Sequence, residues 1–205
     1  MADWDTGSVL AGSDGRVRCA WATRLEADAD LLGYHDAEWG APGAGDAAVL
    51  EALSLGIFQA GLNWLTVLHK REAFRRAFHD FDPGRVAAMG PDEVAALFEN
   101  AAIIRNRAKI EATLHNAAVM TASTRPLADI AAEYAPADAP RPTHGGHVAP
   151  HTAESEALSR RLKAEGYSFI GPTSTYSLMQ TIGIVNDHIV GCFRGDELAA
   201  ARDRS

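Results

Sequence analysis

The stretch Ile103-Ile104-Arg105-Asn106-Arg107-Ala108-Lys109-Ile110 is the part of the sequence that decides the fold. It predicts a short turn that leads into a helix, with Ile110 and Leu114 spaced for one buried face. A tight turn before a helix exposes backbone N–H groups that can bind a phosphate, and the basic residues of the stretch would add positive charge. Charged helix starts are common on protein surfaces, so this stretch indicates helix more strongly than it indicates a function.

The segments before this stretch also have helical patterns. A helix capped by Asp46 would bury apolar residues among 49–55, and a second helix would run from near Trp64 to Phe78 with one apolar face. Proline at the first helical position is expected in two further helices, at Asp82-Pro83 and Gly90-Pro91.

The segments after the stretch continue the pattern. Residues 135–152 are rich in proline and glycine and predict an irregular loop, whose three histidines we interpret as loop residues rather than as a metal site. A helix should follow and end near Gly166, and a last helix should run from about Pro172 to Gly183. No alternating β-branched run is flanked by hairpin turns, so the sequence predicts an all-α fold.

The bulk properties indicate one globular domain. The chain has 205 residues, of which 47% are hydrophobic, and no run of apolar residues is long enough to span a membrane. We expect a loose polar arm at 1–16, a single domain at 17–194 and a tail at 195–205, in a monomeric, cytoplasmic protein. The net charge of -8 counts against nucleic-acid binding unless a local basic patch provides the contact.

Two cysteines and two histidines form a candidate metal site. His188 and Cys192 are four residues apart, which predicts that both side chains share one face of a helical turn. Cys19 and His35 would complete a Cys2His2 set, which suits tetrahedral zinc. The residues alone leave a second interpretation open, namely buried thiols and a core histidine without a metal.

Four aromatic residues form a second candidate group, because bases stack on such side chains. They are Trp21, Tyr34, Trp39 and Trp64. Ordinary core packing is the alternative for each of them.

Seven short motifs within residues 17–194 closely resemble the DNA-3-methyladenine glycosylase I family and occur in the same order as in that family. They are Arg18-Cys19-Ala20-Trp21, Tyr34-His35-Asp36-Ala37-Glu38-Trp39-Gly40, Gln59-Ala60-Gly61-Leu62-Asn63-Trp64, the Ile103–Ile110 stretch, Gly171-Pro172-Thr173, Tyr176-Ser177-Leu178-Met179-Gln180 and Val185-Asn186-Asp187-His188.

The resemblance implies a helix-hairpin-helix glycosylase fold with a helical lobe in which one structural zinc ion joins the chain ends. The implied zinc ligands are Cys19, His35, His188 and Cys192. The implied base-pocket residues are Trp21, Tyr34, Gly56, Asn63 and Trp64. The implied DNA contacts are Gly61 and Leu62 in an inserting loop and Arg105, Asn106, Arg107 and Lys109 in a phosphate-binding hairpin.

The sequence departs from the family at the base pocket. Gly56 stands where the family has a glutamate that contacts the alkylated base, and Asn63 replaces the usual serine before the pocket tryptophan. A Trp-Ser pair of the family is also absent, with Ala132-Glu133 in its place. The pocket is therefore expected to be wider and less anionic than is usual in the family.

The resemblance implies hydrolysis of the N-glycosidic bond of an N-alkylated purine in double-stranded DNA, as in base excision repair. No residue of the sequence is identified as a general base. Two alternatives follow from Gly56: a diverged enzyme that acts on a bulkier alkylated base or on a nucleoside outside DNA, and an inactive DNA-binding relative.

Overall fold

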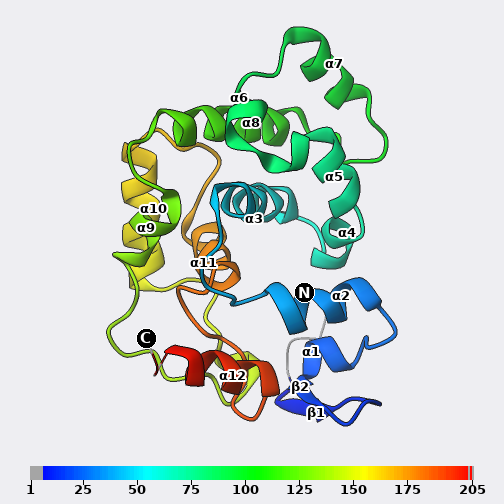
Figure 1. The fold of residues 1–205 in the computed structure, drawn as a ribbon, viewed down its shortest axis with the longest axis vertical. Coiled ribbons are helices and arrows are strands. Elements are labelled where there is room, and N and C mark those ends of the chain that lie inside the picture. The colour runs from blue at the N-terminus through cyan, green and yellow to red at the C-terminus, as the bar shows by residue number, and fades with distance from the viewer. Residues whose placement is uncertain (1–6, 203, 205) are drawn as a thin grey trace. The chain divides into compact units, whose positions relative to one another are not determined.

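The computed structural model describes residues 7–202 and 204, and this part of the chain is mostly helical (Figure 1). Its strands are β1 (Val9–Ala11) and β2 (Val17–Cys19), which pair antiparallel. The predicted all-α character is therefore confirmed apart from one short hairpin. None of the described helices is long and apolar enough to cross a membrane.

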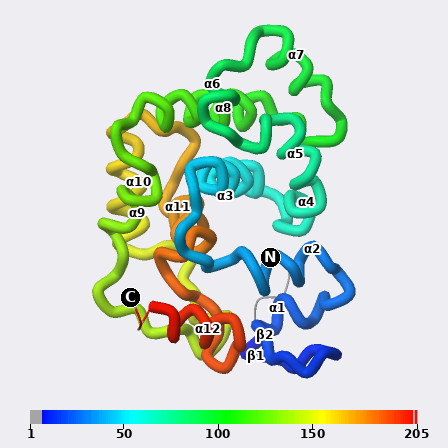
Figure 2. The backbone as a smooth tube through the Cα atoms, viewed as in Figure 1, coloured from blue at the N-terminus to red at the C-terminus, as the bar shows by residue number. Residues whose placement is uncertain are grey.

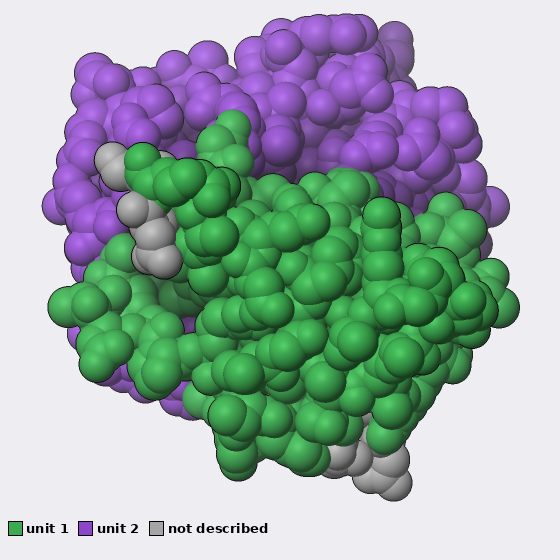
Figure 3. Space-filling model, turned by 60° about the horizontal axis from the view of Figure 1, so that its bottom comes forward, with its two compact units in different colours: residues 1–43, 135–150, 179–205 green, residues 44–134, 151–178 purple. Residues whose placement is uncertain are grey.

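The chain forms two compact units, which are coloured separately in Figure 3. Unit 1 comprises Met1–Gly43, Ala135–Pro150 and Met179–Ser205, and unit 2 comprises Ala44–Tyr134 and His151–Leu178. Each unit therefore combines segments that are distant in sequence.

Unit 2 is a set of helices around an aromatic core. The helices are α3 (Asp46–Gln59), α4 (Trp64–Leu68), α5 (Arg71–Ala77), α6 (Pro83–Ala87), α7 (Pro91–Glu99), α8 (Arg107–Ala122), α9 (Leu127–Ala132), α10 (Ala153–Ala164) and most of α11 (Pro172–Thr181), with the 3-10 turn η3 (His79–Phe81). Phe58 of α3 packs against Phe74, and Phe78 stacks on Phe81, all without exposed surface. Burial of these rings, together with the aliphatic residues of the same cluster, stabilises the unit.

Local sequence explains most of the helix boundaries in unit 2. Asn106 caps α8 and accepts a hydrogen bond from the N–H of Lys109, and Asp82 caps α6 before its proline. Two boundaries differ from expectation. Gly45, not Asp46, is the N-cap of α3, and the predicted helix from Trp64 to Phe78 is broken after Leu68 into α4 and α5.

Unit 1 brings the two ends of the described chain together. Besides the hairpin it contains α1 (Ala20–Thr23), α2 (Ala29–Gly33), the π-helix η2 (Tyr34–Glu38), the 3-10 turn η4 (Gly145–His147) and α12 (Phe193–Arg202). In Figure 2 the blue hairpin and the red α12 lie side by side, and α12 contacts β2.

Both ends of the described chain have more regular secondary structure than the sequence indicated. Residues 9–11 pair with 17–19, so the described part of the expected loose arm is a hairpin, while residues 1–6 lie outside the described residues. The expected tail at 195–205 instead continues α12 to Arg202, which makes α12 and not α11 the last helix. The hairpin was missed because its strands have three residues each, too few to show a period.

Candidate functional site

The first half of a candidate metal site comes from the hairpin and η2. Cys19 ends β2 without exposed surface, and its Sγ accepts a hydrogen bond from the N–H of Ile189 at 3.3 Å. His35 of η2 is also fully buried, and its Nε2 lies 3.6 Å from Sγ of Cys192. Two side chains from the start of the chain thus meet one from its end.

The ring of His35 is oriented by an ion pair. Its Nδ1 lies 2.8 Å from Oδ1 of Asp36, and Asp36 accepts hydrogen bonds from Arg18 at 2.8 to 3.0 Å. Burial opposes ionisation of Asp36, but the hydrogen bonds and charges of Arg18 and His35 together outweigh it and lower the pKa of the carboxyl. An ionised Asp36 accepts the Nδ1–H of His35, which leaves a lone pair on Nε2 for a metal.

The second half of the site comes from a turn, not from a helix. Residues 186–192 are non-helical, with the N–H of Cys192 donating to the carbonyl of Ile189 at 2.9 Å and Gly191 at φ 90°. The prediction that His188 and Cys192 share one helical turn is therefore wrong. A reversal at Gly191, which glycine adopts without steric cost, takes the place of the helix.

His188 has the protonation state that a ligand needs. Its Nδ1 lies 3.1 Å from Oδ1 of Asn186, and its buried Nε2 has no hydrogen-bond partner among the described residues. Burial lowers the pKa of His188 to about 4, so the ring is neutral at pH 7. An orphaned buried nitrogen of this kind is costly unless something binds it.

Arg141, from the irregular loop, supports the same turn. Its Nε donates to the carbonyl of His188 at 3.0 Å, and its Nη2 donates to the carbonyl of Ile189 at 2.8 Å. Sequence reasoning missed this residue, because nothing in a proline-rich loop indicates where it packs. It also missed Arg18 and Asp36, although both directly adjoin ligand candidates in the sequence.

The residues present fit a metal ion. The ligand atoms of Cys19, His35 and Cys192 all lie within 4.8 Å of one another, and the ring of His188 lies 5.1 Å from that of His35. The two free thiols are buried. A hydrogen bond from Cys19 lowers the pKa of Cys192 to about 3, and the same contact, together with burial, raises the pKa of Cys19. Cysteine sulfur together with imidazole nitrogen is a donor set typical of zinc.

The aromatic residues of unit 1 surround these ligand candidates. Trp21 makes edge contacts with His35 at 5.0 Å and Trp39 at 5.3 Å, measured between ring centroids. Tyr34 precedes His35 in η2, is buried, and has its Oη 3.3 Å from Oγ1 of Thr181. The backbone that carries His35 therefore also places Tyr34.

The implied DNA-inserting residues lie in unit 2, in residues 60–63, here called the Gly61 turn. Gly61 has φ 80°, and the N–H of Leu62 donates to the carbonyl of Gln59 at 2.7 Å. The side chain of Leu62 is 43% exposed. Asn63 ends the turn and caps α4, since its Oδ1 accepts from the N–H of Leu65 at 2.8 Å. Trp64 is the first residue of α4 and is half-buried.

Gly56 lies on the least buried stripe of α3. Ala52, Gly56 and Gln59 are half-buried, whereas the other residues from Val49 to Phe58 are buried. A Cβ atom at Gly56 would meet nothing within 4 Å. The space next to this glycine can therefore hold a side chain.

The implied phosphate-binding residues divide into two groups. Arg105, Asn106 and Arg107 are exposed at the start of α8, where Arg107 lies over the ring of Phe98. Lys109 is only 7% exposed and donates to backbone carbonyls at the end of α3. The structure therefore contradicts a phosphate-contacting position for Lys109, because its ammonium group is inside the unit.

Phe169 is a residue that sequence reasoning missed. In the described part of the chain it is the one exposed side chain among the phenylalanines, tyrosines and tryptophans, and it has φ 60° in the turn between α10 and α11. Asn116 of α8 holds this turn through hydrogen bonds to the N–H and the carbonyl of Ser168, at 2.8 and 3.1 Å. A bulky residue in the left-handed region costs about 1–3 kcal/mol, and such strain is often found at functional sites.

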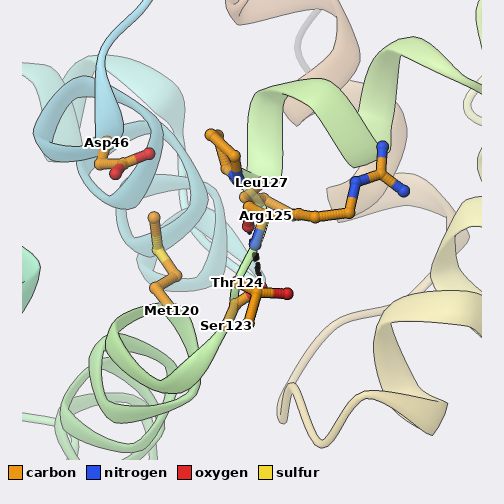
Figure 4. A pocket seen from close by; sticks show the side chains of 7 residues that line it. Asp46, Met120, Ser123, Thr124, Arg125 and Leu127 are labelled. Carbon is orange, nitrogen blue, oxygen red and sulfur yellow. Dashed lines mark hydrogen bonds between the residues drawn. The ribbon is translucent and has the colours of Figure 1, made fainter.

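A small pocket of unit 2 is a poor alternative site (Figure 4). Its lining residues are Asp46, Met120, Ser123, Thr124, Arg125, Pro126 and Leu127, none of them aromatic. The bond from the N–H of Arg125 to Ser123 only shapes the turn after α8. Nothing in this pocket can stack a base.

Comparisons with known proteins identify the family. The sequence profile of the methyladenine glycosylase family matches residues 21–195. DNA-3-methyladenine glycosylase 1 of Escherichia coli (strain K12) is 41% identical, over 85% of this chain and 95% of that protein.

Two solved structures are also similar. A crystal structure of 3-methyladenine DNA glycosylase I has a TM-score of 0.79 at 40% identity, and covers 86% of this chain and 98% of its own. A Staphylococcus aureus structure, which concerns 3-methyladenine recognition by the same kind of enzyme, has a TM-score of 0.74 at 29% identity, covering 82% and 92%. On the match of the family profile and of a relative along nearly its whole length, this chain belongs to the methyladenine glycosylase family.

Proposed function

We propose that this protein is a DNA glycosylase that hydrolyses the N-glycosidic bond of 3-methyladenine-type purines in double-stranded DNA, the first step of base excision repair. The observation that carries the proposal is the 41% identity to the Escherichia coli DNA-3-methyladenine glycosylase 1 over 85% of the chain. The retained Tyr34, Trp21 and Trp64 support it, because they supply a base-binding set.

The reaction needs little acid catalysis from the protein. Adenine alkylated at N3 is cationic and is already a good leaving group, so the enzyme must extrude the nucleotide, stack the base and admit water at the sugar. By resemblance to the family, Trp21 and Trp64 are the candidates for stacking the base, and Tyr34 is the candidate for hydrogen-bonding to its edge. No residue is assigned as the general base.

We infer that one zinc ion binds to Cys19, His35, His188 and Cys192. The orphaned Nε2 of His188 and the mutual proximity of the other three ligand atoms support this set. Four protein ligands leave no open position for water, so the role of the zinc would be structural. Elemental analysis of freshly purified protein should find about one zinc per chain; its absence from protein never exposed to chelator would end the inference.

We further propose that DNA is contacted by exposed turns of unit 2. Leu62 would insert at the site of the extruded nucleotide, and Arg105, Asn106 and Arg107 would contact the phosphate backbone. The exposed Phe169 is a second candidate contact, in the turn that Asn116 holds. Such a small local surface is compatible with a net charge of -8.

We also propose that Gly56 shifts the substrate range toward bulkier purine adducts. A glutamate at this position would bring a carboxylate near the cationic base, and glycine removes that charge and leaves room. The competing outcomes are action on a nucleoside outside DNA and binding without catalysis.

The deciding experiment is incubation with methylated DNA, followed by chromatography of the released bases. Release of 3-methyladenine supports the main proposal, and release of other bases supports the substrate shift. A chain that binds duplex DNA but releases no base from methylated DNA, from adduct-bearing DNA or from free nucleosides would overturn the proposal.

A further inference from the structure

Lys109 is a buried cation that neither the metal site nor the proposed DNA surface uses. It lies in the first turn of α8, and its Nζ donates to the carbonyl of Phe58 at 3.0 Å and to that of Ala60 at 2.6 Å. Among the described residues, no carboxylate forms an ion pair with it. Both of its acceptors belong to the C-terminal end of α3.

The position of this charge is unfavourable for α8 and favourable for α3. A cation near the N-terminus of its own helix opposes the helix dipole, whereas a cation at the C-terminus of another helix satisfies carbonyls that lack an intrahelical partner. Burial also lowers the pKa of Lys109, which shows that its surroundings disfavour the charged form. An apolar side chain would fill the same space without this desolvation cost. The particular contribution of lysine is therefore its hydrogen bonds to α3.

The carbonyls that Lys109 holds lead directly into the Gly61 turn. Ala60 is the first residue of the turn, Gly61 follows with φ 80°, and Asn63 closes it as the cap of α4. The turn is thus held at one end by Lys109 and at the other end by the Asn63 cap. The half-exposed side chain of Leu62 extends between these two supports.

We propose that Lys109 is a positioning residue that holds the Gly61 turn in the conformation that inserts Leu62 into DNA. This rests on the proposed DNA glycosylase function. Arg107 is the first residue of α8, and Arg105 lies two residues before it. Lys109, in the first turn of the same helix, therefore also links the proposed contact with the DNA backbone to the insertion of Leu62. Replacement of the lysine should leave binding of undamaged duplex nearly intact and should impair extrusion of the nucleotide.

The experiment compares Lys109→Met, Lys109→Arg and the matched control Lys70→Met. Lys70 also donates to a backbone carbonyl, that of Ala102 at 2.8 Å, and neither of these residues is in the Gly61 turn or among the proposed DNA contacts. Binding to an undamaged duplex, fluorescence of 2-aminopurine beside the lesion, and base release at saturating enzyme are measured for each. Thermal melting checks that each variant is folded.

For Lys109→Met we expect a tenfold or greater reduction of the saturated rate and of the fluorescence change, with duplex affinity altered less than about threefold, which is about 0.7 kcal/mol. Lys109→Arg should recover part of the rate, and Lys70→Met should match the natural chain. In a double-mutant cycle, Leu62→Ala should reduce the saturated rate by a much smaller factor in the Lys109→Met background than in the natural chain, because both changes remove the same insertion.

An unchanged saturated rate in Lys109→Met, a decrease confined to duplex affinity, or full additivity with Leu62→Ala would overturn the positioning role. Hydrogen exchange at the amide of Leu62 separates this inference from the proposed function. Unchanged protection in Lys109→Met refutes the inference whatever the activity. A natural chain that releases no base refutes the proposed function instead, and the exchange result then decides whether Lys109 holds the turn.

Discussion

Replacement of Gly56 by glutamate is the most direct test of how this chain departs from its family. The glycine lies inside α3, where glycine is about 1 kcal/mol less favourable than alanine. A Cβ at this position meets nothing within 4 Å, so a steric clash does not oppose the gain in helix stability. Gly56→Ala should therefore stabilise the fold by up to about 1 kcal/mol, or about 2–4 °C in Tm.

The effect on activity is separable from this gain in stability. A charged hydrogen bond to the base in a desolvated pocket is worth about 1.5–3 kcal/mol, which is roughly a ten- to hundredfold change in preference. Gly56→Glu should thus raise release of 3-methyladenine by that factor and lower removal of a bulky purine adduct. Gly56→Gln has the size of the glutamate variant without its charge and should show only part of the increase in 3-methyladenine release. Gly56→Ala should show none of this increase.

The assay is single-turnover base release from methylated DNA and from DNA with a bulky purine adduct, with Tm measured for all four proteins. If the natural chain already excises 3-methyladenine efficiently and Gly56→Glu gains nothing over Gly56→Ala, Gly56 does not redirect specificity. A lower thermal stability in Gly56→Ala would contradict the open space that the structure shows beside this residue.

Three further side chains give predictions that can be measured directly. Asp36→Asn removes the anion that orients His35 and should weaken zinc retention about 10- to 100-fold in competition with a chelator; equal retention would show that Asp36 does not orient the ligand. Arg105→Glu should weaken binding to every duplex sequence alike. It should also reduce the magnitude of the slope of log affinity against log salt concentration by about 0.9 for each phosphate that the protein no longer neutralises, and an unchanged slope would place the phosphate-binding surface elsewhere. Burial raises the pKa of Tyr167 to about 12, whereas a tyrosine in the unfolded chain has a pKa near 10, so the unfolded chain releases this proton first as the pH rises. The free energy of unfolding should therefore fall between about pH 10 and 12, by up to about 1.4 kcal/mol per pH unit. In urea titrations Tyr167→Phe should lose less stability than the natural chain across that range, and an equal loss in both proteins would rule Tyr167 out as the cause.

Several local features of the chain could be predicted from sequence because their physics is local. Asn106 and Asp82 are side-chain caps that act within three residues, so the starts of α8 and α6 are encoded where they occur. The ordered motifs around Cys19, Tyr34 and Trp64 were sufficient to indicate the family before any geometry was known.

The tertiary structure decided what depends on contacts between distant segments. Arg141 donates to the carbonyl of His188, and Arg18 donates to the carboxylate of Asp36 that orients His35, and sequence spacing reveals neither bond. His188 and Cys192 are joined by a turn at Gly191, whereas their four-residue spacing suits a helix equally well.

Lys109 shows the same limit most clearly. By sequence it is one more cation at a helix start, and only the packing of α8 against α3 turns its charge inward to the carbonyls of Phe58 and Ala60. The sequence by itself determined the family, most helices of unit 2 and the candidate ligands, because motifs and caps are encoded by neighbouring residues. Which charges face solvent and which support a turn was decided by the tertiary structure, because burial is a property of the packed chain.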